Sequence, residues 1–249
     1  MNSIKPEDVT AYVNQNIGSF HQARLARLKF LKLSQILRRK NPYLFKAKNI
    51  TLAQDLVRTL LDAHLSSQEE TLFGDFLEGL AVFINKGVCG GWKSSAQGVD
   101  LEFDRDGTRF ILAIKSGPNW GNSSQIRKMK DDFRKAKQTI RSSNSDIHVT
   151  AINGCCYGQN TKPDKGDYYK YCGQTFWEFI SGNPDLYLEI IKPLGYTARK
   201  RNSEFYKEYS QIVNKFTSEF SQKYVVNGEI DWDALVRFNS GKPEPKHKK

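Results

Sequence analysis

The stretch GVDLEFDRDGTRFILAIKSG, residues 98–117, decides the fold. From Val99 to Asp104, apolar and acidic residues alternate, which is the period-two pattern of a half-buried strand. Asp106 and Gly107 come next, and this dipeptide favours a hairpin turn because glycine tolerates a positive φ. The residues after the turn are mostly apolar and end on Lys115. The stretch therefore predicts two antiparallel strands joined by a tight turn.

An acid and a lysine stand on the two strands of this hairpin. Asp100 lies near the start of the first strand and Lys115 at the end of the second, so both can meet at one edge of the sheet. Phosphodiester hydrolysis uses such a pair, with a carboxylate to hold Mg²⁺ and an ammonium to position water or offset phosphate charge. Two solvated surface charges would give the same pattern. The next segment, SGPNWGNSSQ, is rich in glycine and amides, as ligand-facing loops often are.

The composition narrows the class of protein. A chain of 249 residues can bury one substantial core. Its formal charge of +11 and its pI of about 9.4 favour a polyanionic partner, and attachment to an anionic membrane surface would explain them equally well. We find neither an apolar run of membrane-spanning length nor a signal peptide, and we expect a cytoplasmic protein.

Cysteine and histidine offer no metal-binding pattern. Adjacent Cys155 and Cys156 lack the spacing of zinc ligands, and Cys89 and Cys172 stand alone. The histidines form no closely spaced pair. We expect the four thiols to be buried or inert in a reducing compartment.

The remaining pattern predicts helices on both sides of a short sheet. The fold class is α/β with an α+β tendency, a short central mixed sheet flanked by helices, with extra N- and C-terminal helices. Helices are expected over about 6–39, from Thr51, from a Ser67 cap to about Asn85, and over 124–142, 174–181, 185–192, 203–224 and 231–238, with strands over about 98–104, 109–116 and 147–153.

Several runs of the chain resemble type II restriction endonucleases of the PD-(D/E)XK superfamily, in particular the PmeII/TdeIII-like type and relatives that read GGNCC-core sites. The matching runs are KNPYLFKAKNI (40–50), LSSQEETLFGDFLEGLAVF (65–83), GVDLEF (98–103) and IKSGPNWGNSSQ (114–125), with looser matches at CYGQ and CGQTFWEFISG (172–182). The resemblance implies a restriction-endonuclease-like core. It also implies Mg²⁺-dependent cleavage of both strands of double-stranded DNA at a short, GGNCC-like site, leaving 5′ phosphates.

In that family Asp100 and Lys115 would be catalytic, but one position departs from the pattern. The superfamily places an acid two residues before the lysine, where this chain has Ala113. The resemblance implies that a helix acid takes its place, and Glu78 is favoured as the second metal ligand. Glu70 is the runner-up, although Ser67-x-x-Glu70 also fits a capping box. Glu102 is the third possibility, because it shares a strand face with Asp100.

Two polar segments are expected to bind the DNA. The helix after Lys115 is basic, and its N-terminus should lie near the scissile phosphate. The expected DNA-binding residues are Asn119, Trp120, Asn122, Ser123, Ser124, Gln125, Arg127 and Lys128 in the first segment, and Gln159, Asn160, Lys162 and Lys165 in the second.

We expect one endonuclease domain over residues 1–241 that acts as a homodimer with a cognate DNA methyltransferase in the same system. Its parts are a helical region (about 6–64), a catalytic core (about 65–195) and C-terminal helices (about 200–239), followed by a basic disordered tail (242–249). Two alternatives stay open, namely a structure-selective junction or repair nuclease on the same core and a DNA-binding protein whose active site has decayed.

Overall fold

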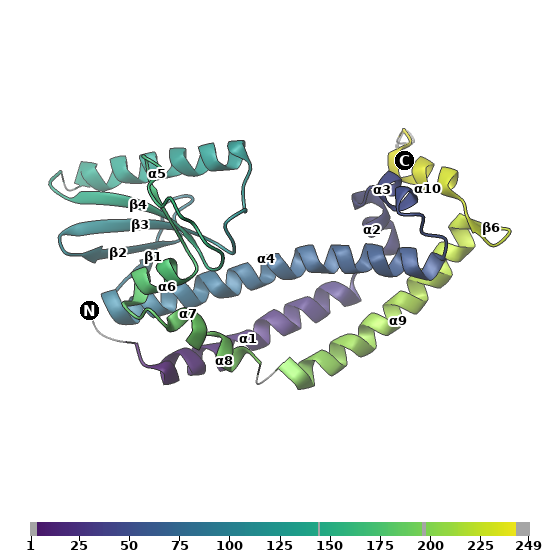
Figure 1. Cartoon of the computed structure of the whole chain (residues 1–249), viewed down its shortest axis with the longest axis horizontal. Coiled ribbons are helices and arrows are strands. Elements are labelled where there is room, and N and C mark those ends of the chain that lie inside the picture. The colour runs from purple at the N-terminus through teal and green to yellow at the C-terminus, as the bar shows by residue number, and fades with distance from the viewer. Residues whose placement is uncertain (1–3, 144, 196–197, 243–249) are drawn as a thin grey trace, which may run out of the picture. The chain divides into compact units, whose positions relative to one another are not determined.

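The computed structural model describes residues 4–143, 145–195 and 198–242, so residues 243–249 of the expected tail lie outside it (Figure 1). The chain forms two compact units, each built from two separate segments. The sheet unit comprises Met1–Phe20 and Glu70–Arg199, and the helical unit comprises His21–Glu69 and Lys200–Lys249. Within the described residues, no helix is both long and apolar enough to cross a membrane.

A five-stranded mixed sheet forms the centre of the sheet unit, which confirms the predicted fold class. Its strands follow one another in chain order: β1 (Trp92–Lys93), β2 (Leu101–Arg105), β3 (Thr108–Lys115), β4 (His148–Cys155) and β5 (Tyr169–Cys172). The first three strands are antiparallel, whereas β4 and β5 run parallel to β3.

The predicted hairpin is confirmed as β2 and β3. Leu101 pairs with Leu112 and Arg105 with Thr108, so the turn contains Asp106 and Gly107 alone. Both turn residues have positive φ, 51° and 73°, which matches the right-handed twist of the flanking strands.

Helices cover both faces of the sheet. Leu101, Leu112 and Ile114 point to one face and share a core with Leu80 and Ile84 of α4 (Ala53–Cys89). On the other face, Ile111, Ala113 and Val149 share a core with Met129, Phe133 and Ala136 of α5 (Ser123–Ser143). Burial on both faces explains why β3 and β4 are apolar over most of their length.

The rest of the sheet unit is helical. The first part of α1 (Pro6–Lys29) supplies Val9, Val13 and Ile17 to the α4 side of the core. The predicted segment 174–181 is α6 (Gln174–Ser181), and the predicted helix over 185–192 is divided into α7 (Leu186–Glu189) and α8 (Ile191–Leu194).

The helical unit has a separate core. It contains the end of α1, α2 (Leu33–Arg39), α3 (Pro42–Ala47), the start of α4, α9 (Ala198–Tyr224) and α10 (Trp232–Ser240). A small hairpin, β6 (Val225–Val226) and β7 (Glu229–Ile230), joins the last two helices. Fully buried side chains from these elements pack together, among them Leu28, Ile36, Leu56, Leu61, Phe216 and Phe220.

Two helix predictions were wrong. No new helix begins at Ser67, because α4 is continuous and the Ser67 hydroxyl donates to the carbonyl of Ala63 one turn earlier (3.1 Å). The pattern S-x-x-E also fits a helix interior, so it did not mark a helix start here. The helix expected over 6–39 is interrupted after Lys29. Sequence reasoning also missed the short helix α3, which begins at Pro42 and is capped by Asn41.

Candidate active site

Asp100 is held at the edge of the sheet by two hydrogen bonds to β3. Its backbone N–H donates to the Leu112 carbonyl, and its carboxylate Oδ2 accepts from the Ile114 N–H, both at 2.7 Å. The carboxylate is about one-fifth exposed, so it is both restrained and accessible. This geometry follows from the hairpin register, which places Asp100 beside the end of β3.

Lys115 is the last residue of β3 and lies next to Asp100. Its ammonium Nζ is 3.7 Å from Asp100 Oδ2, and its side chain is about one-third exposed. The structure therefore brings together the acid and the lysine that the hairpin pattern predicted. The same ammonium lies 5.5 Å from the centre of the Trp120 ring, so an aromatic face limits its movement.

Glu78 of α4 lies within the electrostatic field of this pair. Burial raises the pKa of Glu78 and the negative charge of Asp100 raises it further, whereas Lys93 and Lys115 lower it. One turn earlier on α4, a Cβ on Gly74 would lie 3.6 Å from the Cβ of Ser116, so α4 passes close to the end of β3. Glu78 Oε1 also lies 3.4 Å from Lys93 Nζ.

The two other candidate acids lie in different surroundings. Glu102 is buried on β2 and accepts a hydrogen bond from the Ser94 hydroxyl at 2.5 Å, and that hydroxyl in turn accepts from the Ala96 N–H. These bonds give Glu102 a role in holding the loop after β1. Glu70 is exposed inside α4, so the capping box with Ser67 that we expected does not form.

A buried amide links β3 to the Trp120 loop, and sequence reasoning missed it. Asn153 of β4 is 1% exposed. Its Nδ2 donates to the Ala113 carbonyl (3.1 Å), and its Oδ1 accepts from the Trp120 indole Nε1 (3.0 Å). Asn153 thus fixes the indole of Trp120, one of the predicted DNA-binding residues, and the Trp120 ring lies close to the Lys115 ammonium. The signal available was an amide at the end of the predicted strand IHVTAIN.

The first predicted DNA-binding segment begins α5. The Asn122 and Gln125 side chains each accept from the other's backbone N–H, at 3.0 and 2.9 Å, and so cap the helix reciprocally. Ser123 and Ser124 are exposed beside them, and Asn119 lies in the preceding loop. Lys128 is paired with Asp132 at 2.9 Å. Arg127 is exposed and helps to line a basic hollow of about 570 Å³ with Lys130, Arg134 and Lys137.

The second predicted segment lines a hollow of about 620 Å³ after β4 and β5. Gln159 and Asn160 line it, whereas Lys162 and Lys165 are not part of its wall. The Asn160 side chain already has a partner within the protein, because its Nδ2 donates to the Lys170 carbonyl at 2.9 Å. Tyr157, Gln174 and Thr175 also line this hollow, although we had not predicted them.

Two backbone hydrogen bonds connect this hollow to the end of β3 and the residue after it. The N–H groups of Cys156 and Tyr157 donate to the carbonyls of Lys115 and Ser116, at 2.9 and 3.1 Å. The Tyr157 ring then lies so close to Gly117 that a Cβ there would be 2.3 Å from it. Two residues that line the polar hollow, Cys156 and Tyr157, are therefore bonded directly to Lys115 and to the residue after it.

Three of the four thiols, those of Cys155, Cys156 and Cys172, are buried as predicted, and that of Cys89 is half-buried. Burial, with Cys172 as a smaller cause, raises the pKa of Cys155 to about 12, and burial also raises the pKa of Cys156. Protonated thiols are poor metal ligands. Among the described residues, no three His, Cys, Asp or Glu side chains form a group that could hold a metal ion. Any ion at this edge would have the two carboxylates of Asp100 and Glu78 available to it.

A comparison with protein families identifies the chain. The family model described as type II restriction endonuclease EcoO109I matches residues 7–202, a range that contains the hairpin, Glu78 and both polar segments. No curated protein matches the chain. Type II restriction endonucleases bind DNA, act as site-specific deoxyribonucleases and typically need a divalent metal ion. The chain belongs to the EcoO109I family of type II restriction endonucleases.

Proposed function

We propose that Asp100, Glu78 and Lys115 form the active site of a Mg²⁺-dependent restriction endonuclease that cuts both strands of a short site in duplex DNA. The observation that carries the proposal is the 3.7 Å approach of Lys115 to Asp100 at a sheet edge, within the field of a third charged group, Glu78. A surface ion pair alone would not require a partly buried second carboxylate beside it.

The donor set fits Mg²⁺. This ion prefers oxygen ligands and is commonly held by one or two carboxylates together with water. Asp100 and Glu78 would supply them. Burial is the main cause that raises the pKa of Glu78, and the cation would relieve the second cause, the repulsion from Asp100. When bound, the ion supplies Lewis acidity toward the phosphate and lowers the pKa of water. Ala113 contributes no side-chain ligand, so Glu78 stands in for the acid that the superfamily places there.

Lys115 would orient the attacking water and offset the negative charge that develops on the phosphoryl oxygens. Water adds to phosphorus as the bond to the 3′ oxygen breaks, and the water proton passes to solvent or to the departing oxygen. The products are a 3′ hydroxyl and a 5′ phosphate. The Trp120 ring and the Asn153 amide below it keep the lysine on the side of Asp100.

The runs that resemble PmeII/TdeIII-like enzymes support a proposal for the DNA site and for the oligomeric state. The PmeII/TdeIII-like runs support a GGNCC-like site, read by exposed groups such as Gln159 and Ser124 at groove depth. A partly palindromic site favours a homodimer with one active site per strand. Such an enzyme requires a cognate DNA methyltransferase to protect the host genome.

Digestion of a sequenced plasmid and of phage DNA in Mg²⁺ tests this proposal. We expect discrete fragments whose ends map to one short motif and carry 5′ phosphates. Cleavage restricted to four-way junctions or flaps would instead indicate a structure-selective nuclease. Tight DNA binding without cleavage in either Mg²⁺ or Mn²⁺ would indicate a decayed active site.

A further inference from the structure

The two units differ sharply in charge. The helical unit contains 20 Lys and Arg residues against 10 Asp and Glu, a formal charge of +10. The sheet unit contains 18 against 17, a formal charge of +1. Nearly all of the excess positive charge therefore belongs to the unit that lacks Asp100, Glu78 and Lys115.

The excess is concentrated in one segment. From Val9 to Gln54 the chain has nine Lys and Arg residues and no Asp or Glu. This acid-free segment contains most of α1 and all of α2 and α3. In contrast, the described α9 side chains from Asn202 onward include three lysines and three glutamates, so their charges balance.

Some of these cations have structural partners, and others do not. Arg24 bonds Glu69 and stacks on the Phe205 ring, Lys29 lies 3.6 Å from Glu208, and Lys40 donates to the Ala63 carbonyl. Arg27 of α1 is exposed and has no acid within 4 Å among the described residues, and the same holds for five cations of α2, α3 and their flanking residues. These are Lys32, Arg38, Arg39, Lys46 and Lys48.

The helices that carry these residues pack against α10. Asn239 of α10 donates to the carbonyls of Leu37 and Lys40, at 2.6 and 3.1 Å, which ties the end of α2 to it. Arg38 lies over the Phe238 ring at 5.3 Å, and Lys46 lies over the Trp232 ring at the same distance. Aromatic rings thus hold two of the cations in place at the surface.

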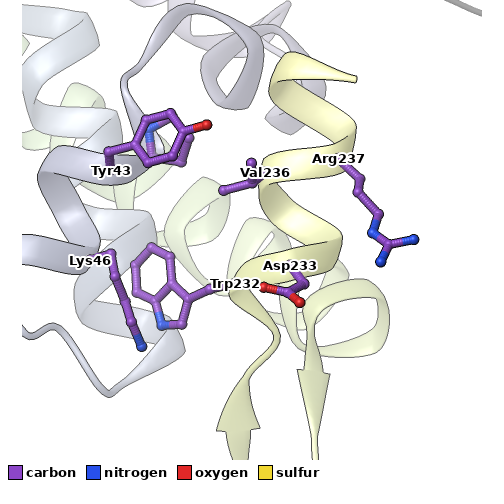
Figure 2. Close-up of a pocket in the computed structure, with 7 residues that line it drawn as sticks. Tyr43, Lys46, Trp232, Asp233, Val236 and Arg237 are labelled. Atoms are coloured by element: carbon purple, nitrogen blue, oxygen red, sulfur yellow. The ribbon is translucent and has the colours of Figure 1, made fainter. Parts of the chain in front are cut away.

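A pocket of about 370 Å³ opens between α3 and α10 (Figure 2). Tyr43, Trp232 and Val236 supply flat or apolar walls, Lys46 runs alongside the Trp232 ring, and Arg237 projects from α10. Asp233 is the single acid among the lining residues, so the lining is net positive. Apolar walls with cations at the rim suit a sugar–phosphate chain, in which deoxyribose packs on a ring while the phosphate meets the ammonium.

We propose that α2, α3 and α10 form a second DNA contact, which holds duplex phosphates without reading bases. The proposal rests on the proposed function, since it assigns this surface to the same substrate. Charge favours this partner over a second copy of the chain, because a two-fold contact would place unpaired cations opposite one another. Phosphate contacts supply sequence-independent affinity through counterion release.

Salt-dependent binding tests the surface directly. The patch variant Lys32→Ala/Arg39→Ala/Lys46→Ala removes three cations from this surface. The control Lys207→Ala/Lys215→Ala/Lys223→Ala removes three from the balanced α9 of the same unit. Affinity for a 30-base-pair duplex of random sequence is measured by fluorescence anisotropy in EDTA, over a series of salt concentrations. Circular dichroism and sedimentation report folding and mass.

We expect the patch variant to bind roughly 10–100-fold more weakly at moderate salt, with the slope of log affinity against log salt reduced by about 2–3. The control should stay within about twofold of wild type. The single variant Lys46→Ala, expected to lose about one unit of slope, keeps the test decisive if the triple variant folds poorly.

Three outcomes would overturn the inference. If patch variant and control have equal slopes, the patch does not hold phosphates, although sequence-specific cleavage by wild type would still support the proposed function. If the patch variant loses affinity only because its sedimenting mass halves, the surface joins two copies of the chain. If wild type binds no duplex at all, the proposed function fails together with the patch.

Discussion

The sheet unit and the helical unit divide two requirements that conflict in a nuclease. Metal-dependent hydrolysis needs carboxylates, and those carboxylates repel the DNA that must approach them. The sheet unit contains Asp100 and Glu78 and is almost neutral overall, although its helix α5 is basic. The helical unit carries a charge of +10 and no catalytic candidate. If both proposals hold, attraction to DNA and chemistry on DNA belong to different units of one chain, and each can be changed alone.

The sharpest test changes the chemistry while leaving affinity intact. Asp100→Asn keeps the oxygen that accepts from the Ile114 N–H but removes the charge that would hold the metal. We expect cleavage to fall by at least roughly 10²–10³-fold, while binding of duplex DNA stays equal or tightens. Single-turnover cleavage and anisotropy measure the two effects. Near wild-type cutting in Mg²⁺ would disprove the hairpin assignment.

Lys115→Ala should reduce the rate through a different interaction. It removes one ammonium that would stabilise the developing phosphoryl charge, with an expected loss of roughly 10²-fold. Folding should survive, since the side chain lies at a strand end and is one-third exposed. Lys93→Ala is the matched control, because Lys93 is an exposed lysine beside Glu78 but not beside Asp100. Similar losses in both variants would mean that general positive charge, and not Lys115 itself, matters.

The position of the second carboxylate can be tested with two isosteric variants. Glu78→Gln should lose cleavage, and Glu70→Gln should change it little. Because the folded protein raises the pKa of Glu78, ionised Glu78 costs stability at neutral pH, and Glu78→Gln should raise the melting temperature. Loss of activity combined with a gain in stability is a pattern that a purely structural acid would not give. An inactive Glu70→Gln beside an active Glu78→Gln would reverse the assignment.

Asn153→Ala tests whether the amide below the active site positions Lys115. The variant leaves the partly buried indole N–H of Trp120 and the Ala113 carbonyl without their partner, which should cost about 1–3 kcal/mol of stability. We expect kcat to fall by roughly tenfold, which corresponds to about 1.4 kcal/mol, with KM little changed. Asn153→Asp, which keeps an acceptor for the indole, should recover part of the rate. A destabilised enzyme with full kcat would limit Asn153 to a structural role.

The smallest effect is expected in the helical unit. Burial, with Arg39 and Lys40 nearby, lowers the pKa of His64 below its ordinary value of 6.5. As the pH falls, His64 is protonated in the unfolded chain before it is protonated in the folded protein. The contribution of neutral His64 to stability is therefore fully present above about pH 6.5 and is lost as the pH falls toward the folded pKa. His64→Gln should flatten the dependence of the unfolding free energy on pH as the pH falls below about 6.5. Cleavage at pH 8 should not change.

Local signals were enough to predict the hairpin that carries Asp100 and Lys115. Alternation and the Asp106-Gly107 turn determine the register, and the register alone places Asp100 beside Lys115. The position of Glu78 depends on how α4 packs on the sheet. The sequence pattern alone therefore left three acids as candidates for the second metal ligand. Asn153 was missed because its partners belong to a strand and a loop some 30–40 residues earlier. Tertiary packing also made α4 continuous through Ser67, where a local capping pattern indicated a start.

The acid-free segment from Val9 to Gln54 also bears on how a rare site is found within a long DNA molecule. A surface that grips phosphates but ignores bases lets a protein move along the duplex between collisions. An enzyme with such a surface would then reach its site sooner on kilobase-long DNA than on a short oligonucleotide. That advantage would become smaller at higher salt, because salt weakens the contacts with phosphate. The surface of α2, α3 and α10 would then determine how fast the enzyme finds its site, and the hairpin would determine how fast it cleaves there.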